Sequence, residues 1–279
     1  MGETVDVPHG VGVAVKAQAL GLRGPRGWAY RGVDIDAEPG ALIAIEGPSG
    51  SGRTSLLLTL TGRMRPTEGR ASVGRFRLPK QMAAVRRISA LGPVPGVTDL
   101  DPSLTVAEHL SERTLLQRRY DGSLRALLRS LLRPRAERAA EVRLRIESAL
   151  SAAGLDTSAL PKGTPTAVRD LERLEALRLS LALALIGRPG VLGVDDTDLK
   201  LSDAERAEAW ALLRSIAEAG TTVVAVCSEA PEDVQTVSTA SRTENPRTAP
   251  SSAPAPSDRT DMADDEKETA DALAEAGRA

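Results

Sequence analysis

The chain has 279 residues, which is enough for one large domain or two small ones with a sizeable aliphatic core. It carries 36 basic and 38 acidic side chains, a formal net charge of −2, and only 2% aromatic residues. A generally polyanion-binding protein, or one that stacks single-stranded bases on aromatic rings, is therefore not expected. We predict no nucleic-acid partner.

The cysteine count and the apolar stretches limit the cellular location. A single cysteine, Cys227, cannot form an intrachain disulfide, and the first ten residues lack a basic region followed by an apolar one. The strongest apolar stretch, residues 177–187, is about half of the ~20 residues needed to span a bilayer. We therefore expect a cytosolic chain that does not cross a membrane by itself.

Alternating hydrophobicity at the start of the chain predicts an antiparallel sheet from residues 11–20 and 32–37. The unbroken apolar run at 41–46 predicts a strand covered on both faces. Strands and helices then alternate, which predicts an α/β fold with a mostly parallel sheet. The expected later elements are helices at 54–62, within 104–155, at 168–186 and at 203–219, and strands at 190–194 and 221–227.

Two segments have an unusual composition. Residues 241–279 are rich in Pro, Ser and Ala with a net charge of −4, which predicts a disordered acidic tail. Residues 111–150 contain ten arginines and five acidic residues. This surplus is consistent with a solvated helix surface, or with a surface that contacts a membrane protein or anionic headgroups.

The most specific motif is Gly-Pro-Ser-Gly-Ser-Gly-Arg-Thr at residues 47–54, a Walker A loop between a predicted strand and a predicted helix. Its glycines let backbone N–H groups surround phosphate oxygens, and the helix N-terminus favours negative charge. Arg53 stands where the motif has lysine, so altered nucleotide binding is expected. The candidate nucleotide-binding residues are Gly47, Pro48, Ser49, Gly50, Ser51, Gly52, Arg53, Thr54 and Ser55.

With this loop, the sequence resembles the ATP-binding subunit of ABC transporters, and the resemblance covers about residues 11–230. Residues 47–69 and 101–110 resemble the family's phosphate loop with its first helix and the start of its helical subdomain. The resemblance implies a nucleotide-binding domain over 1–240, a P-loop NTPase with a RecA-like parallel sheet, an N-terminal antiparallel β subdomain and a helical subdomain at about 93–180.

The resemblance also implies ligands and partners. ATP and Mg²⁺ are the expected cofactors. The expected partners are a transmembrane permease and a second ATP-binding subunit, which would form a homodimer or a heterodimer with this chain. The expected location is cytoplasmic, peripheral on the inner face of the cell membrane. Residues 190–197 resemble the family's Walker B strand, so Asp195 is expected to hold Mg²⁺ together with Thr54. Asp196 stands at the position of the catalytic glutamate.

Several other family motifs are replaced. The glycine-rich signature falls on Leu171–Glu175, no glutamine follows Leu91, and Ser228 stands at the switch-histidine position. Hydrolysis is therefore expected to be weak or lost, and a non-hydrolytic nucleotide sensor or regulatory pseudo-ATPase that partners a membrane protein is the alternative. For Trp28, stacking on adenine and packing within the edge sheet both remain open.

Overall fold

The computed structural model describes residues 11–120, 134–197 and 201–239. Its elements are β1 (Val15–Gly24), β2 (Gly27–Ala37), β3 (Leu42–Glu46), α1 (Arg53–Leu60), β4 (Glu68–Val73), β5 (Phe76–Leu78), α2 (Met82–Ile88), β6 (Ser89–Leu91), α3 (Val106–Tyr120), α5 (Arg135–Ala152), the 3₁₀ turn η1 (Val168–Asp170), α6 (Arg173–Leu185), β7 (Val191–Val194), α7 (Asp203–Glu218), β8 (Thr222–Cys227) and β9 (Gln235–Ser238).

The strands form two sheets. One is parallel, with the order β6-β7-β8-β3-β9, and the other is antiparallel, with the order β2-β1-β4-β5. In the parallel sheet β3, β7 and β8 are almost wholly apolar, as expected for strands that are covered on both faces. The α/β architecture predicted from the sequence is confirmed.

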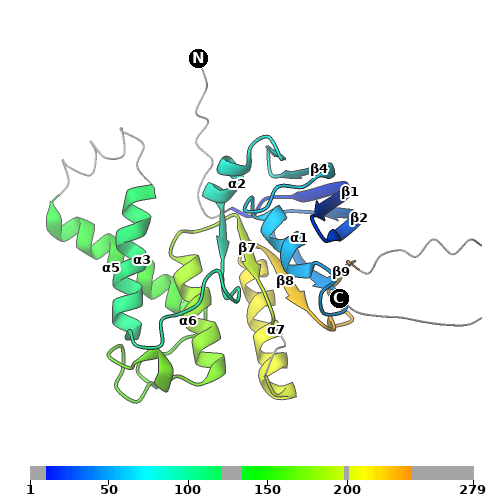
Figure 1. The fold of residues 1–279 in the computed structure, drawn as a ribbon. Coiled ribbons are helices and arrows are strands. Elements are labelled where there is room, and N and C mark those ends of the chain that lie inside the picture. Colours follow the sequence, from blue (N-terminus) through cyan, green and yellow to red (C-terminus); the bar gives the residue numbers. More distant parts are fainter. Residues whose placement is uncertain (1–10, 121–133, 198–200, 240–279) are drawn as a thin grey trace, which may run out of the picture. The chain divides into compact units, whose positions relative to one another are not determined.

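Helix α1 packs between the two sheets, and α7 covers the other face of the parallel sheet (Figure 1). The core between the sheets includes Leu56, Leu57 and Leu60 of α1, all fully buried. A third cluster joins α3, α5 and α6 through residues such as Val106 and Leu179. The layers place the N-terminus of α1 at the carboxyl edge of the parallel sheet, where ligands bind in open α/β sheets.

Some predicted elements have different bounds. The helix expected at 168–186 is a 3₁₀ turn followed by α6, which begins only at Arg173. The short strands β4, β5, β6 and β9 and helix α2 were not predicted. The tail at 241–279 and residues 121–133 of the arginine-rich segment lie outside the described residues. Within the described part, no helix has the length and hydropathy that a membrane span requires.

Candidate functional site

The phosphate loop, residues 47–54, joins the end of β3 to the start of α1. Gly52 is the N-cap of α1 and has a φ of 83°, and Gly50 has a φ of 81°. Both values lie in the left-handed region that favours glycine. The loop therefore turns sharply from the strand into the helix and ends at the helix N-terminus, which favours anions.

Two loop glycines are also required by close packing. A Cβ atom on Gly52 would lie 2.1 Å from the carbonyl oxygen of Ala29 in β2. A Cβ atom on Gly47 would lie 2.5 Å from the hydroxyl oxygen of Thr239. A Cβ atom on Gly50 meets nothing within 4 Å. The loop is thus held between β2 on one side and the segment after β9 on the other, and is open at Gly50.

The predicted magnesium ligands lie together. The hydroxyl of Thr54, in the first turn of α1, donates a hydrogen bond of 2.7 Å to the Asp195 carboxylate after β7. Asp195 is only 3% exposed. Burial raises the pKa of the Asp195 carboxyl, as does the neighbouring Asp196, while the Thr54 hydroxyl and the Arg53 charge lower it.

This pair suits a divalent cation that also binds phosphate. A hydroxyl and a carboxylate are hard oxygen donors, and Mg²⁺ typically takes one or two protein oxygens, waters and substrate phosphates. A cation beside Asp195 also favours the charged form that burial disfavours. Among the described residues no group of three or more His, Cys, Asp and Glu side chains forms a metal site of its own.

Arg53, which replaces the Walker A lysine, reaches the end of β8. Its guanidinium donates to the backbone carbonyl of Cys227, the residue before Ser228. The charge of Arg53 therefore lies over the carboxyl edge of the sheet, close enough to Asp195 to lower its pKa. The planar guanidinium has further donors available for phosphate oxygens.

The segment after β7 is strained and anchored. Asp196 has a φ of 49°, and its backbone N–H donates to the Asp195 carboxylate over 3.0 Å. Both the backbone N–H and the hydroxyl of Thr197 donate to the carbonyl of Val226 in β8, over 3.1 and 3.0 Å. The half-buried Asp196 is thus held next to the Thr54 and Asp195 pair, and its catalytic role remains a prediction.

One residue of the site was missed by sequence reasoning. Thr239, directly after β9, donates its backbone N–H to the carbonyl of Glu46 over 2.9 Å. Its hydroxyl lies 2.6 Å from the hydroxyl of Ser51 in the phosphate loop, and Thr239 is 4% exposed. No motif marks this position, because β9 is short and its partner strand is remote in sequence.

The signature position forms the start of α6. Glu172 is the N-cap and Glu175 the third helical residue, and the two form a capping box in which the Glu175 carboxylate accepts the backbone N–H of Glu172 over 2.8 Å. The helix N-terminus is therefore occupied by its own carboxylates. In the family, serine and glycine stand here.

The aromatic residues of β2 differ in exposure. Tyr30 is buried and donates its hydroxyl to Thr59 of α1 over 2.8 Å. Trp28 is 37% exposed, and the guanidinium carbons of Arg31 and Arg23 lie 4.7 and 5.7 Å from its ring centroid. These contacts are those of a residue packed within the sheet, while stacking on adenine remains a prediction.

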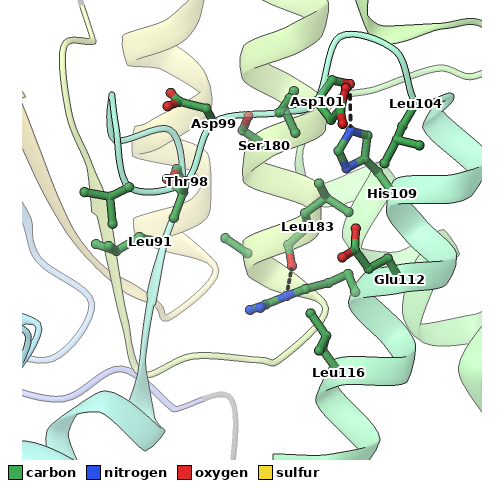
Figure 2. A pocket seen from close by; sticks show the side chains of 15 residues that line it. Leu91, Thr98, Asp99, Asp101, Leu104, His109, Glu112, Leu116, Ser180 and Leu183 are labelled. Carbon is green, nitrogen blue, oxygen red and sulfur yellow. Dashed lines mark hydrogen bonds between the residues drawn. The ribbon is translucent and has the colours of Figure 1, made fainter.

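A cleft of about 520 Å³ separates the end of β6 from α3 and α6 (Figure 2). Val97 and Leu116 line it and are 50% and 41% exposed. His109 is buried in its wall and lies 3.2 Å from the Asp101 carbonyl, and Arg113 donates to the Leu183 carbonyl over 2.9 Å. The segment between β6 and α3 holds no glutamine.

Comparisons with known proteins agree with this geometry. The fold and site define a P-loop nucleotide-binding protein, and the family model described as ABC transporter matches residues 30–198. The chain belongs to the ABC transporter family. Nod factor export ATP-binding protein I of Burkholderia thailandensis is 31% identical over 193 residues, which cover 69% of this chain and 55% of that protein. A putative ABC transporter ATP-binding protein of Streptomyces coelicolor is 28% identical over 212 residues, 76% of this chain and 33% of that one.

Solved structures support the same fold. The ATP-binding cassette MJ0796 bound to ADP and Pi has a TM-score of 0.58 and 23% identity, and the match covers 77% of this chain and 88% of that one. A bacterial Atm1-family ABC exporter with ATP bound has a TM-score of 0.56 and 20% identity, covering 81% of this chain and 37% of that one. The P-loop NTPase fold of an ABC cassette is thereby confirmed. The chain spans about half the length of the first curated relatives it matches, 55% in each.

Proposed function

We propose that the chain is the ATP-binding subunit of an ABC-type membrane transporter, and that it binds Mg-ATP with weak or no hydrolysis. The observation that carries the proposal is the hydrogen bond of 2.7 Å between Thr54 and Asp195 beside an intact glycine loop. This arrangement supports a phosphate cradle with a magnesium position next to it.

The chain's own residues have distinct roles in this proposal. Backbone N–H groups of the phosphate loop bind phosphate oxygens, and Arg53 neutralises their charge. Thr54 and Asp195 would hold Mg²⁺, which would supply positive charge against the phosphate groups. Asp196 is the candidate for orienting water, but its side chain is one methylene shorter than the family's glutamate.

Weak hydrolysis follows from the replaced positions. Ser228 has no imidazole to contact a γ-phosphate, and the capping box of Glu172 and Glu175 presents carboxylates where the family has serine and glycine. Carboxylates repel phosphate oxygens, so a second subunit's nucleotide is poorly stabilised at this surface. The same observation favours the second candidate function, a nucleotide sensor or regulatory pseudo-ATPase.

The partners are a permease and another ATP-binding subunit. The cleft between β6 and α3 offers the apolar side chains of Val97 and Leu116 at its lining, which suits a short amphipathic segment of a permease. The subunit then lies in the cytoplasm, peripheral on the inner face of the cell membrane. The dimer is either a homodimer or a heterodimer with an intact ATP-binding subunit.

Calorimetric titration of the purified chain with Mg-ATP tests the binding. We expect a Kd in the micromolar to millimolar range, about −8 to −4 kcal/mol. Thr54→Val removes the hydroxyl and is expected to weaken ATP binding only when Mg²⁺ is present. Thr54→Ser keeps a hydroxyl at this position and is expected to keep the affinity for Mg-ATP. Absence of any heat or thermal protection by ATP contradicts the proposal.

A further inference from the structure

Positive charge is concentrated in one part of the described chain. Residues 61–90 contain eight basic side chains and one acidic one, whereas the other described residues contain 19 basic and 24 acidic ones. The basic segment comprises the turn after α1, the hairpin of β4 and β5, and α2, which packs beside β5 (Figure 1). We call its eight cations the basic surface: Arg63, Arg65, Arg70, Arg75, Arg77, Lys80, Arg86 and Arg87.

These cations are poorly compensated within the described chain. The one acidic residue of the segment, Glu68, lies 3.5 Å from Arg31 of β2. For each of the seven cations other than Arg75, no carboxylate within residues 11–120, 134–197 and 201–239 lies within ion-pair distance. A surplus of this kind attracts anions from outside.

A groove gives part of the basic surface a defined shape. A cavity of about 950 Å³ lies along β1, β2, β4 and β5, and Arg70, Arg77 and Lys80 line it. Lys16, Asp34 and Asp36 also line the groove. The Lys16 ammonium is paired with Asp36 at 2.8 Å and with Glu38 at 3.4 Å, and the Asp34 carboxylate accepts the backbone N–H of Ala19 over 2.8 Å. Three cations of the groove are therefore available to an external anion.

The cations near α2 also crowd one another. Arg63 donates to the carbonyl of Thr61 and the hydroxyl of Ser89, and Arg86 donates to the carbonyl of Gly62 over 2.9 Å. Burial of the guanidinium and the charges of Arg86 and Arg113 lower the pKa of Arg63 to about 10. Arg63 and Arg86 therefore add positive charge to this part of the chain while donating to its own carbonyl and hydroxyl groups.

We propose that the basic surface binds anionic phospholipid headgroups of the membrane. Seven of its eight cations are arginines, whose planar guanidinium pairs with phosphate through two hydrogen bonds. The charge is spread over a hairpin, a turn and a helix, which suits a plane of headgroups better than a single phosphate. Phe76 is the one aromatic residue of the segment, and the guanidinium carbon of Arg75 lies 5.0 Å from its ring centroid, so the segment offers no row of rings for stacking bases.

Vesicle flotation with the full chain tests the proposal. The vesicles contain phosphatidylcholine with or without about 30% phosphatidylglycerol, so that only the surface charge differs. The test variant replaces Arg70, Arg77 and Lys80 with glutamine. The control variant replaces three exposed cations outside both the basic surface and the arginine-rich segment, Lys162, Arg169 and Arg188, with glutamine and has the same net charge.

The wild type and the control are expected to float with phosphatidylglycerol vesicles, and the groove variant to bind roughly 10- to 100-fold more weakly. Binding is also expected to fall steeply at about 0.5 M salt, where charges are screened. Equal binding by the groove variant, equal loss in the control, or no flotation of the wild type overturns the proposal. Binding to a soluble acidic polypeptide without any vesicle binding also overturns it and indicates an acidic protein partner. Unchanged thermal unfolding of both variants excludes misfolding as the cause.

Discussion

Thr239→Val tests whether the segment after β9 positions the phosphate loop. Valine retains the branched shape but removes a hydroxyl that lies 2.6 Å from the Ser51 hydroxyl and 3.3 Å from the Glu46 carbonyl. A methyl carbon needs about 3.3–3.6 Å to an oxygen, so Ser51 and the loop shift by roughly 0.7 Å or more. The loss of a buried hydrogen bond costs about 1–3 kcal/mol of unfolding free energy.

The displaced loop is expected to bind Mg-ATP about tenfold more weakly, which is about 1.4 kcal/mol. Calorimetric titration measures this, and thermal unfolding measures the stability. Thr236→Val is the matched control, because Thr236 is an exposed residue of β9 whose hydroxyl donates to the carbonyl of Val234, the residue before the strand, and not to the phosphate loop. Ser51→Ala combined with Thr239→Val is expected to cost less than the sum of the two. An ATP affinity within about twofold of wild type for Thr239→Val refutes the reasoning.

Three further predictions concern the same site. Gly52→Ala is expected to lower the melting temperature more than Gly50→Ala, since both have a positive φ but only the former places a Cβ 2.1 Å from a carbonyl oxygen. The folded protein raises the pKa of the Asp195 carboxyl, so its contribution to stability is fully present below the unfolded pKa and is lost as pH rises through the folded pKa. Asp195→Asn should therefore reduce the fall in melting temperature that the metal-free protein shows as pH rises above about 4, and remove the Mg²⁺ dependence of ATP binding; an unchanged profile contradicts this. Asp196→Glu is expected to leave phosphate release at background and to lower the melting temperature, because glutamate tolerates a φ of 49° less well than aspartate; release well above background contradicts it.

The phosphate loop was predictable because its information is local. The glycines, the apolar strand before the loop and the helix after it are contiguous in the sequence, and the structure places Thr54 on Asp195 as the Walker motifs imply. The pairing of β1 with β2 was likewise predictable from alternation, although the strands begin at Val15 and Gly27 rather than at 11 and 32.

The unpredicted parts depend on distant contacts. β9 spans only four residues, and three of them are exposed. It pairs with β3, which lies some 190 residues earlier in the sequence. The sequence around Thr239 therefore has no hydrophobic periodicity that would predict this strand. Helix α6 begins at Arg173 rather than at 168 because Glu172 and Glu175 form a capping box there. This capping signal is local in the sequence, but the prediction assigned these residues to the family's signature position instead. The contact of Arg53 with the Cys227 carbonyl depends on the adjacency of β3 and β8.

We propose that the chain binds ATP and keeps it intact. The most direct measurement equilibrates the purified chain with Mg²⁺ and labelled ATP, separates protein from free nucleotide, and identifies the nucleotide that remains bound over time. We predict that ATP is recovered on the protein with phosphate release near background. No bound nucleotide, or ADP formed at roughly 1 s⁻¹, a rate within the usual enzyme range, contradicts the account.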